Sequence, residues 1–389
     1  MRNRFRSTMV AILAVILLVV TGCGGGASNS NEIKVGGNFE LTGGVANLGK
    51  QTVNGINLAF KQVNQSGGVL GKQIKLVTAD NKSEASESTN AATKLITQDK
   101  VVALLGPVAS SSVIASLQVA TDNKVPVITA TGTNERVTTN ENGTIKRYGF
   151  RACFIDPFQG TVMANFASKS LNAKNAAIYV DNSSDYAKGL AKSFEQTFVN
   201  NGGKIAGSEA YLQKDTDFKA TLTKLKAMNI DVLFVPGYYE EVGRIIRQAR
   251  EMGITAPIIG GDGWDDPKIV EIAGVKAMNN TYFSNHYSPG DKEPFAVKFV
   301  EDYKKEYGQD PSAFAALGYD AAMMLIDAIK RAGTTNPDKI RDALEQTKDL
   351  KVVSGVITLD DKHNPIKSAV VIEFKDGKQV FKEKIEPSK

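Results

Sequence analysis

The sequence has 389 residues, which exceeds the ~250–300 residues over which one hydrophobic core keeps growing, so two domains are expected. It contains 47 lysines and arginines and 42 aspartates and glutamates, but three arginines lie in the first 22 residues, which leaves 44 basic residues in the remainder. This near-neutral balance, without a clustered basic region, argues against a nucleic-acid partner. Two histidines, two cysteines and no paired cysteine spacing argue against a His- or Cys-based metal site.

The first apolar segment, MVAILAVILLVVTGC, covers residues 9–23 and follows the three arginines. It is typical of a secretory signal, because it is shorter than the ~20 residues that a membrane-spanning helix needs. The segment resembles a bacterial lipobox, which predicts that residues 1–22 are removed and that Cys23 is lipidated. An ordinary signal peptide that ends at a cysteine is the alternative. Residues 23–31 would then form a lipid-anchored tether, whose flexible part GGGASNSN spans roughly 15 Å. With Cys23 acylated, Cys153 has no partner for an intrachain disulfide.

From residue 32 the chain alternates short apolar runs with amphipathic segments. The predicted strands cover residues 33–38, 73–79, 101–105, 125–129, 176–180, 232–235 and 257–259. Between them apolar residues recur at helical spacing, for example Val242, Ile245, Ile246 and Ala249 before Gly253. This order predicts an α/β fold of βαβ units, with parallel sheets covered by helices on both faces.

The first series of units ends near residues 147–153, and a second series begins with a helix near Phe158 and continues to Ile259. Beyond residue 286 the sequence predicts three helices, over residues 294–307, 313–332 and 337–347. Residues 353–384 alternate like antiparallel strands, with turns at 360–361 and 376–377.

No catalytic signature stands out in the sequence. Residues 67–73, GGVLGKQ, approach a phosphate-binding loop, but the glycine spacing is one residue short and Gln73 replaces the Ser or Thr, so we predict a turn. There is no G-x-S-x-G elbow and no G-x-G-x-x-G fingerprint. His286 could lie in a cleft, although an ordinary polar residue near a domain crossover is the stronger interpretation. We therefore expect neither enzyme activity nor a cofactor.

Small polar residues follow two predicted strands at their carboxyl ends, where open α/β sheets bind ligands. Residues 106–112, GPVASSS, precede a predicted helix. The serines could simply cap this helix, but three exceed what one cap needs, and free N–H groups at a helix start can also bind a carboxylate. Residues 130–134, ATGTN, follow the next strand. Together the two loops could hold both ends of a small zwitterion.

Six short motifs follow one another along residues 32–375. They are ELTG at residues 40–43, GGVLG at 67–71, ASSS at 109–112, DYAKG at 185–189, PGYY at 236–239 and GDG at 261–263. With these motifs the chain resembles the leucine/isoleucine/valine-type binding proteins of branched-chain amino acid ABC transporters. The resemblance implies a type I periplasmic-binding-protein fold, with two Rossmann-like lobes of parallel sheets flanked by helices and a three-segment hinge.

The resemblance also implies which residues hold the polar ends of an amino acid. Ser110 and Thr133, with backbone groups at Thr131 and Gly132, would bind the α-carboxylate and part of the ammonium. Asp262 falls at the position of the ammonium partner, where the leucine binders carry the longer Glu. Without the resemblance Asp262 would be read as a turn residue in Gly-Asp-Gly. In the ligand-free protein we expect Asp262 to lie in an open, solvated cleft.

The side-chain end of the ligand would meet a mainly apolar wall. The resemblance implies that Tyr186 and Tyr238 close over the ligand and that Phe314 belongs to the side-chain pocket. Leu48 stands at a position that is often aromatic, which alters the volume of the pocket. Two further aromatic residues could lie at the rim, with core packing as the alternative for the first: Tyr239 and Trp264.

The implied lobes are residues 32–151 with 286–354, and residues 152–285 with 355–389. Crossovers near Arg151, His286 and Gly355 would let the lobes close around the ligand. Membrane permease subunits on separate chains would then distinguish the closed form from the open form.

We therefore expect an extracytoplasmic, lipid-anchored and monomeric protein that delivers a branched-chain or another small apolar amino acid to an ABC transporter. An α-amino acid is favoured because both a cation partner and an anion partner are available. The alternatives are a ligand-binding sensor and a binder of amides or other small carboxylates.

Overall fold

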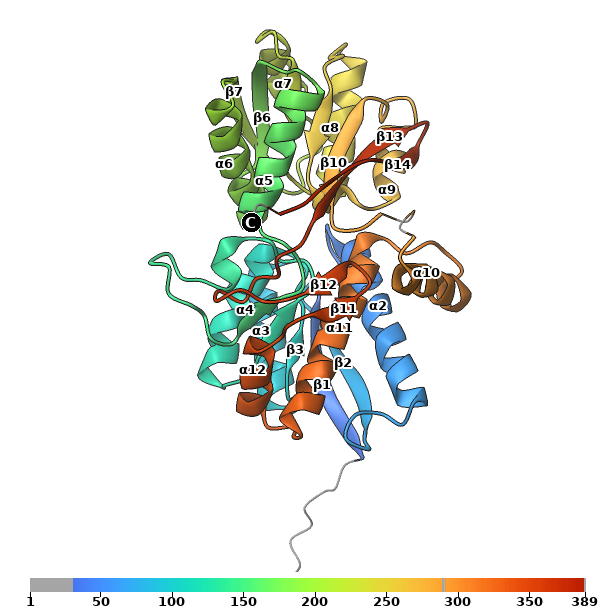
Figure 1. Ribbon diagram of the computed structural model, residues 1–389. Coiled ribbons are helices and arrows are strands. Elements are labelled where there is room, and N and C mark those ends of the chain that lie inside the picture. Colours follow the sequence, from blue (N-terminus) through green and yellow to red (C-terminus); the bar gives the residue numbers. More distant parts are fainter. Residues whose placement is uncertain (1–30, 289, 291, 388–389) are drawn as a thin grey trace, which may run out of the picture. The chain divides into compact units, whose positions relative to one another are not determined.

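Two β-sheets organise the chain in the computed structural model, which describes residues 31–288, 290 and 292–387. Both sheets belong to the compact unit that begins at Ile33 (Figure 1). The predicted signal segment and Cys23 lie outside the described residues.

The first sheet has five strands in the order β2-β1-β3-β4-β5. Its strands are β1 (Glu32–Phe39), β2 (Gln73–Asp80), β3 (Leu104–Leu105), β4 (Val127–Thr129) and β5 (Gly149–Arg151). The pairs β1–β3, β3–β4 and β4–β5 are parallel. The intervening helices are α2 (Ala46–Gln65), α3 (Ala85–Thr97) and α4 (Ser110–Asp122), and a 3-10 turn follows at Glu135–Val137.

The second sheet has seven strands in the order β14-β13-β10-β9-β8-β6-β7. They are β6 (Asn175–Asp181), β7 (Lys204–Tyr211), β8 (Val232–Phe234), β9 (Ile258–Gly260), β10 (Thr281–Asn285), β13 (Ala369–Lys375) and β14 (Lys378–Ile385). Strands β6 to β10 pair in parallel, whereas β13 and β14 add to β10 in antiparallel fashion. The helical segments are α5 (Asp156–Asn165), a π-helical turn (Phe166–Ser170), α6 (Asp185–Asn200), α7 (Lys219–Lys226), α8 (Tyr239–Glu251), a 3-10 turn (Asp262–Trp264) and α9 (Lys268–Ala273).

The predicted parallel sheets flanked by helices are thus confirmed. In α8 the four apolar residues at helical spacing are fully buried, and the helix ends just before Gly253, which has a φ of +78°. Strands β5, β7 and β10 are not among the predicted strands. As an edge strand, β7 has few buried side chains and no continuous apolar run. The predicted strands at 101–105 and 125–129 are shorter in the structure, with bounds of Leu104–Leu105 and Val127–Thr129.

The three later helices lie beside the first sheet, as Figure 1 shows. They are α10 (Pro294–Tyr307), α11 (Ala313–Ala332) and α12 (Pro337–Glu345), close to the predicted bounds. The hairpin of β11 (Leu350–Val352) and β12 (Gly355–Ile357) contacts α11 through β11. His363 Nδ1 lies 2.9 Å from the Gly149 carbonyl oxygen, and Lys367 Nζ donates to the Ala152 carbonyl oxygen over 3.1 Å.

These contacts place residues 363–367 beside β5 and the residue that follows it. The chain stays beside the first sheet up to Lys367 and joins the second sheet only at Ala369. The prediction missed the β11–β12 hairpin, whose turn at Val353 and Ser354 carries no glycine or proline signal. The predicted turn at residues 376–377 does join β13 to β14.

Helices α2 and α11 approach each other closely. A Cβ atom on Gly318 would lie 2.2 Å from the Thr52 carbonyl oxygen, and one on Gly55 would lie 1.9 Å from the Ala315 carbonyl oxygen. Glycine to alanine in a helix ordinarily stabilises a protein by about 1 kcal/mol. At Gly318 the steric conflict with backbone should reverse that sign.

We expect Gly318→Ala to lower the free energy of unfolding by about 2 kcal/mol, because α2 and α11 must move apart. Urea unfolding of both proteins measures this change. Gly44→Ala is the control, since a Cβ there meets nothing within 4 Å. Equal stability of Gly318→Ala and the wild type would contradict the close helix contact.

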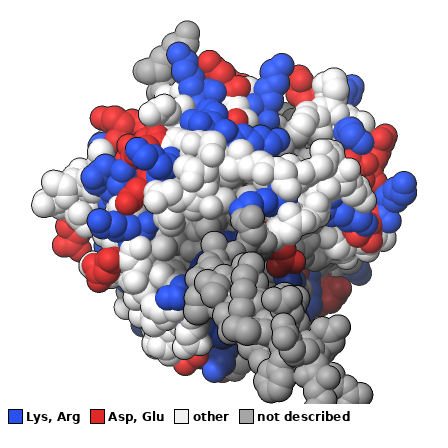
Figure 2. Space-filling view, turned by 90° about the horizontal axis from the view of Figure 1, so that it is seen from below, with Lys and Arg blue, Asp and Glu red and all other residues white. Residues whose placement is uncertain are grey.

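Charges on the described surface are mixed. On the face drawn in Figure 2, basic side chains lie next to acidic ones, in keeping with the near-neutral balance beyond residue 22. Within the described ranges no helix has the length and apolar character needed to cross a membrane. No group of His, Cys, Asp and Glu side chains that could hold a metal ion occurs in the same part of the chain.

Candidate functional site

A small cavity lies at the carboxyl ends of strands from both sheets. Its lining residues are Val108, Ser110, Thr131, Tyr186, Tyr238, Asp262, Gly263 and Phe314. Six of the nine residues predicted to touch a ligand line it, whereas Leu48, Gly132 and Thr133 do not.

The start of α4 forms one polar side of the cavity. The N–H groups of Val108 and Ala109 donate to the Glu40 carboxylate over 2.9 and 3.1 Å, which fixes the loop before the helix. Burial raises the pKa of Glu40, although these two hydrogen bonds act in the opposite direction. The Ser110 hydroxyl oxygen accepts from the Asn134 N–H over 3.2 Å. The N–H groups of residues 110–112 have no acceptor within the described part of the chain, so the helix start can still receive an anion.

Hydrogen bonds to side chains on β4 and β5 hold the loop after β4 in place. The N–H groups of Thr131 and Gly132 both donate to the Thr129 hydroxyl, over 3.3 and 2.8 Å, and the Arg151 guanidinium donates to the Gly132 carbonyl oxygen over 2.8 Å. These two N–H groups, which the resemblance assigned to a ligand carboxylate, therefore already have an acceptor. The Thr133 carbonyl oxygen accepts from the Asp156 N–H, so Thr133 connects this loop to the start of α5.

Asp262 forms the opposite polar side of the cavity and is only 2% exposed. Its Oδ1 accepts from the Gln159 amide over 2.9 Å, and its Oδ2 lies 2.9 Å from His286 Nε2. In this structure α5 and the segment after β10 cover Asp262, and the solvated carboxylate of an open cleft stays a prediction for the open form. Within the described part of the chain no lysine or arginine forms an ion pair with Asp262, so its charge lacks a cationic partner.

The model of the periplasmic binding protein family matches residues 32–379. The chain belongs to this family. The Leu/Ile/Val-binding protein BraC3 of Rhizobium johnstonii is 31% identical over 84% of this chain and 87% of that relative. Among solved structures, the leucine-binding protein LivK of Thermotoga maritima is 39% identical with a TM-score of 0.86, covering 91% of this chain and 99% of its own. LivJ of Streptococcus pneumoniae, solved in complex with isoleucine, is 40% identical with a TM-score of 0.86, covering 92% and 100%.

These findings confirm the resemblance and the type of fold. Proteins of the periplasmic binding protein family bind solutes outside the cytoplasm, and the family is not a class of enzymes.

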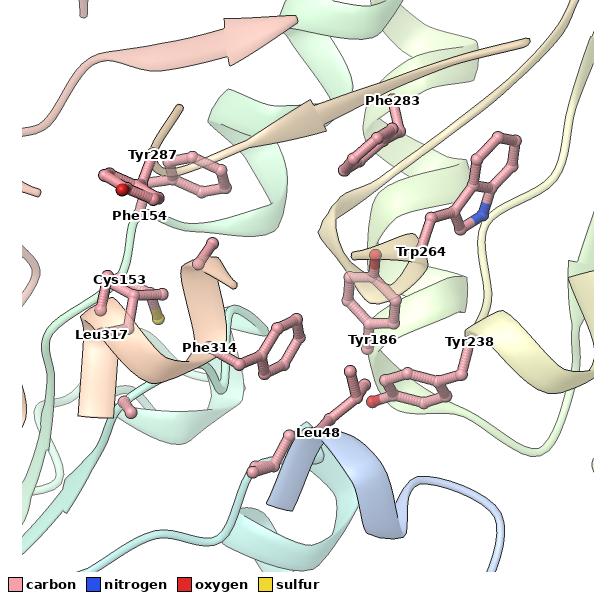
Figure 3. Packing of buried hydrophobic residues seen from close by; sticks show 14 of the residues in the cluster. Leu48, Cys153, Phe154, Tyr186, Tyr238, Trp264, Phe283, Tyr287, Phe314 and Leu317 are labelled. Carbon is pink, nitrogen blue, oxygen red and sulfur yellow. The ribbon is translucent and has the colours of Figure 1, made fainter. Parts of the chain in front are cut away.

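Aromatic side chains form the apolar wall of this binding protein's cavity. Figure 3 shows Phe314, at the start of α11, opposite Tyr186 and Tyr238. The rings of Tyr186 and Tyr238 have centroids 5.3 Å apart, and the Tyr186 hydroxyl accepts from the Gly263 N–H over 3.1 Å. Burial, and next the charge of Asp262, raise the pKa of Tyr186 well above its ordinary value. Leu48 belongs to the same buried cluster (Figure 3).

The rim position expected for Trp264 is wrong, and Tyr239 follows the core-packing alternative. Trp264 is fully buried, its indole N–H donates to the Val235 carbonyl oxygen over 3.2 Å, and its ring packs against Gly260. Tyr239 is buried in the same hydrophobic cluster.

His286 was expected to be an ordinary polar residue, yet it contacts the carboxylate of Asp262. Its ring also stacks on Phe154 with a centroid separation of 3.5 Å. Sequence spacing gave no sign of this contact, because residues 262 and 286 are joined through α9 and β10 and meet only after β9 and β10 pair.

Asp156 is a second buried carboxyl group that sequence analysis missed. Burial, and then the charge of Asp262, raise its pKa to about 8. One of its oxygens accepts from the Asn134 amide over 3.1 Å. In the sequence Asp156 precedes Pro157 at a helix start, where an acidic residue is unremarkable.

Polar contacts hold the two sheet assemblies together around the cavity. The Gln51 amide on α2 donates to Asp266 over 2.8 Å, and the Ser111 hydroxyl on α4 accepts from the Asp185 N–H over 3.0 Å. At the surface, Lys214 Nζ lies 2.6 Å from a Glu84 carboxylate oxygen. Each contact joins an element of the first sheet assembly to one of the second, so the cavity is closed in this structure.

Proposed function

We propose that this protein captures a small amino acid with an apolar side chain in the cavity between its two sheets. The proposal rests on one observation: the cavity has hydrogen-bond donors for an anion at one end and a carboxylate for a cation at the other. The start of α4 with Ser110 offers N–H groups and a hydroxyl to a carboxylate, and buried Asp262 offers an uncompensated charge to an ammonium. A zwitterion of small size satisfies both ends at once.

The remaining lining favours an apolar side chain. Val108, Phe314 and the two tyrosine rings surround the space between the polar ends. Two similar proteins carry leucine or Leu/Ile/Val in their names, and LivJ was solved with isoleucine, which supports a branched-chain ligand. Thr131 lines the cavity, and we assign Gly132 and Thr133 to the shape of the loop rather than to direct contact.

Capture would proceed by closure of two lobes, without catalysis. We assign residues 32–151 and 286–367 to one lobe and residues 152–285 and 368–389 to the other, with the third crossover moved to follow Lys367. Closure forms the polar contacts between the sheet assemblies and shields the ligand from water. Permease subunits of an ABC transporter would then receive the ligand from the closed form of the monomer.

Membrane attachment would come from a lipid on Cys23. We expect Cys23→Ser either to release the protein from membranes or to leave its signal uncleaved, because the substituted residue offers no thiol for acylation. Membrane fractionation of cells that express each variant, with the mass of the mature chain, measures both effects. Cys153→Ser is the control, since Cys153 is buried within the fold. Unchanged fractionation together with normal processing would exclude the anchor.

Calorimetric titration of the signal-free chain with the twenty amino acids and their simple amides tests the proposed function. We expect the tightest binding from leucine, isoleucine or valine. A ligand at a hundred times its dissociation constant should also stabilise the folded state by ~2.7 kcal/mol, which a thermal melt detects. Absence of binding by every amino acid would contradict the proposal.

A further inference from the structure

The carboxylate of Asp262 is held by two uncharged groups. Gln159 donates an amide N–H to Oδ1, and His286 Nε2 lies 2.9 Å from Oδ2. Both side chains are buried, and they come from different elements, α5 and the segment after β10. Two anchored donors fix both oxygens of the carboxylate, so its orientation is set before a ligand arrives.

The surroundings of His286 select one form of the imidazole. Nδ1 is buried and has no hydrogen-bond partner within the described residues, whereas Nε2 faces a carboxylate oxygen. The neutral tautomer with the proton on Nε2 satisfies this arrangement, since a proton on Nδ1 would have no acceptor. Phe154 stacks on the ring with an interplanar angle of 22°, which fixes the plane of the imidazole.

We propose that His286 is a positioning residue for the ligand's cationic end: as a neutral N–H donor it orients Asp262 without cancelling its charge. This inference rests on the proposed function. An imidazolium at the same place would neutralise Asp262 and repel an ammonium. A neutral donor instead leaves the full negative charge for the ligand.

The groups around His286 support a neutral ring. Burial lowers the pKa of His286 below its ordinary value, although the hydrogen bond and charge of Asp262 act in the opposite direction. The charge of Lys367 lowers this pKa and the charge of Asp265 raises it. Asp156 is a further carboxyl group near Asp262, whose charge raises the pKa of Asp156. Phe154 and Gln159, two other neighbours, have no titratable group.

The sign of the pH dependence follows from this arrangement. A bound ammonium disfavours the imidazolium, so binding becomes weaker as the pH falls through the pKa of His286, which lies below 6.5. Below that pKa the affinity attributable to His286 should fall by about tenfold per pH unit. Because Asp156 and the other carboxyl groups titrate too, only the difference between two variants isolates His286.

Three variants test the proposal, with leucine and isoleucine as probes in calorimetric titrations from pH 5 to 8. His286→Gln retains an N–H donor that cannot become a cation, so at pH 7.5 it should bind within threefold of the wild type. It should also lose the wild-type weakening at low pH. His286→Leu removes the donor and should bind at least tenfold more weakly at pH 7.5. His363→Gln is the matched control, because the other histidine stacks on Phe150 and faces the Gly149 carbonyl oxygen.

A measurement that leaves His286 unchanged tests the proposal even if the His286 variants do not fold. The chain has two histidines, so nitrogen chemical shifts of their side chains are assigned by comparison with His363→Gln alone. We expect the Nε2–H tautomer at His286 at pH 7, with shifts that change on ligand binding. A protonated ring or a proton on Nδ1 at pH 7 would overturn the inference, as would a His286→Leu variant that binds as tightly as the wild type at pH 7.5. Failure of the wild type to bind any amino acid would instead overturn the proposed function, with the tautomer still readable.

Discussion

Asp262→Asn is expected to weaken amino-acid binding by about a hundredfold or more, because it removes the charge that faces the ligand ammonium. Hydrogen bonds to charged groups contribute roughly 1.5–3 kcal/mol, and a buried pair that loses one charge can cost roughly 3–5 kcal/mol. Since ~1.4 kcal/mol corresponds to a tenfold change in affinity, the expected loss follows directly. Calorimetric titration of both proteins with leucine measures it.

The same substitution should cost the ligand-free protein little stability. Gln159 Oε1 has no hydrogen-bond partner within the described residues, so its amide can turn over and accept from the amide that replaces the carboxylate, while His286 continues to donate to the remaining oxygen. Asp265→Asn is the control, because Asp265 is a buried neighbour outside the cavity lining and accepts from the Ala313 N–H. If Asp262→Asn bound as tightly as the wild type, the ligand would lack an ammonium and the class of ligand would change.

Leucinamide is expected to bind about a hundredfold more weakly than leucine. The amide is uncharged and presents N–H groups of its own to the donors at the start of α4, whereas a carboxylate accepts from them. Loss of two charge-assisted hydrogen bonds of roughly 1.5 kcal/mol each gives the expected ratio. Competition titrations with both compounds measure it.

The Ser110→Ala variant distinguishes binding of the ligand carboxylate from binding by the rest of the cavity. The variant should weaken leucine binding while it leaves leucinamide binding nearly unchanged, so the two affinities approach each other. The Ser110 hydroxyl also accepts from the Asn134 N–H, so a thermal melt must accompany the titrations. Equal affinity of the wild type for leucine and leucinamide would show that α4 does not hold a carboxylate.

Most of the fold could be predicted from the sequence, because it depends on local patterns of apolar residues. Strands such as β8 are continuous apolar runs between helices with buried apolar faces, and both patterns are local. The edge strand β7 and the β11–β12 hairpin were missed because their stability depends on neighbours distant in the sequence. The contact of Lys367 with Ala152, across 215 residues, likewise has no local signal in the sequence.

The polar loops at the strand ends could also be predicted, because parallel strands bring their carboxyl ends to one edge. The residues that hold these loops and Asp262 in place could not be predicted. Glu40 was visible only as part of a motif, yet its carboxylate fixes Val108 and Ala109 before α4. Gln159 and His286 reach Asp262 across 103 and 24 residues, a separation that no local spacing rule covers. Trp264 was misassigned because its burial depends on contact with Gly260.

A crystal structure of the protein with leucine would test the central claim most directly, because the claim concerns which atoms hold each end of the ligand. The account predicts one leucine in the cavity, with its ammonium ~2.7–3.2 Å from Asp262 and its carboxylate at similar distances from Ser110 and the N–H groups that begin α4. The side chain should lie against Phe314. A reversed ligand, or a leucine bound without contact to Asp262, would contradict the account.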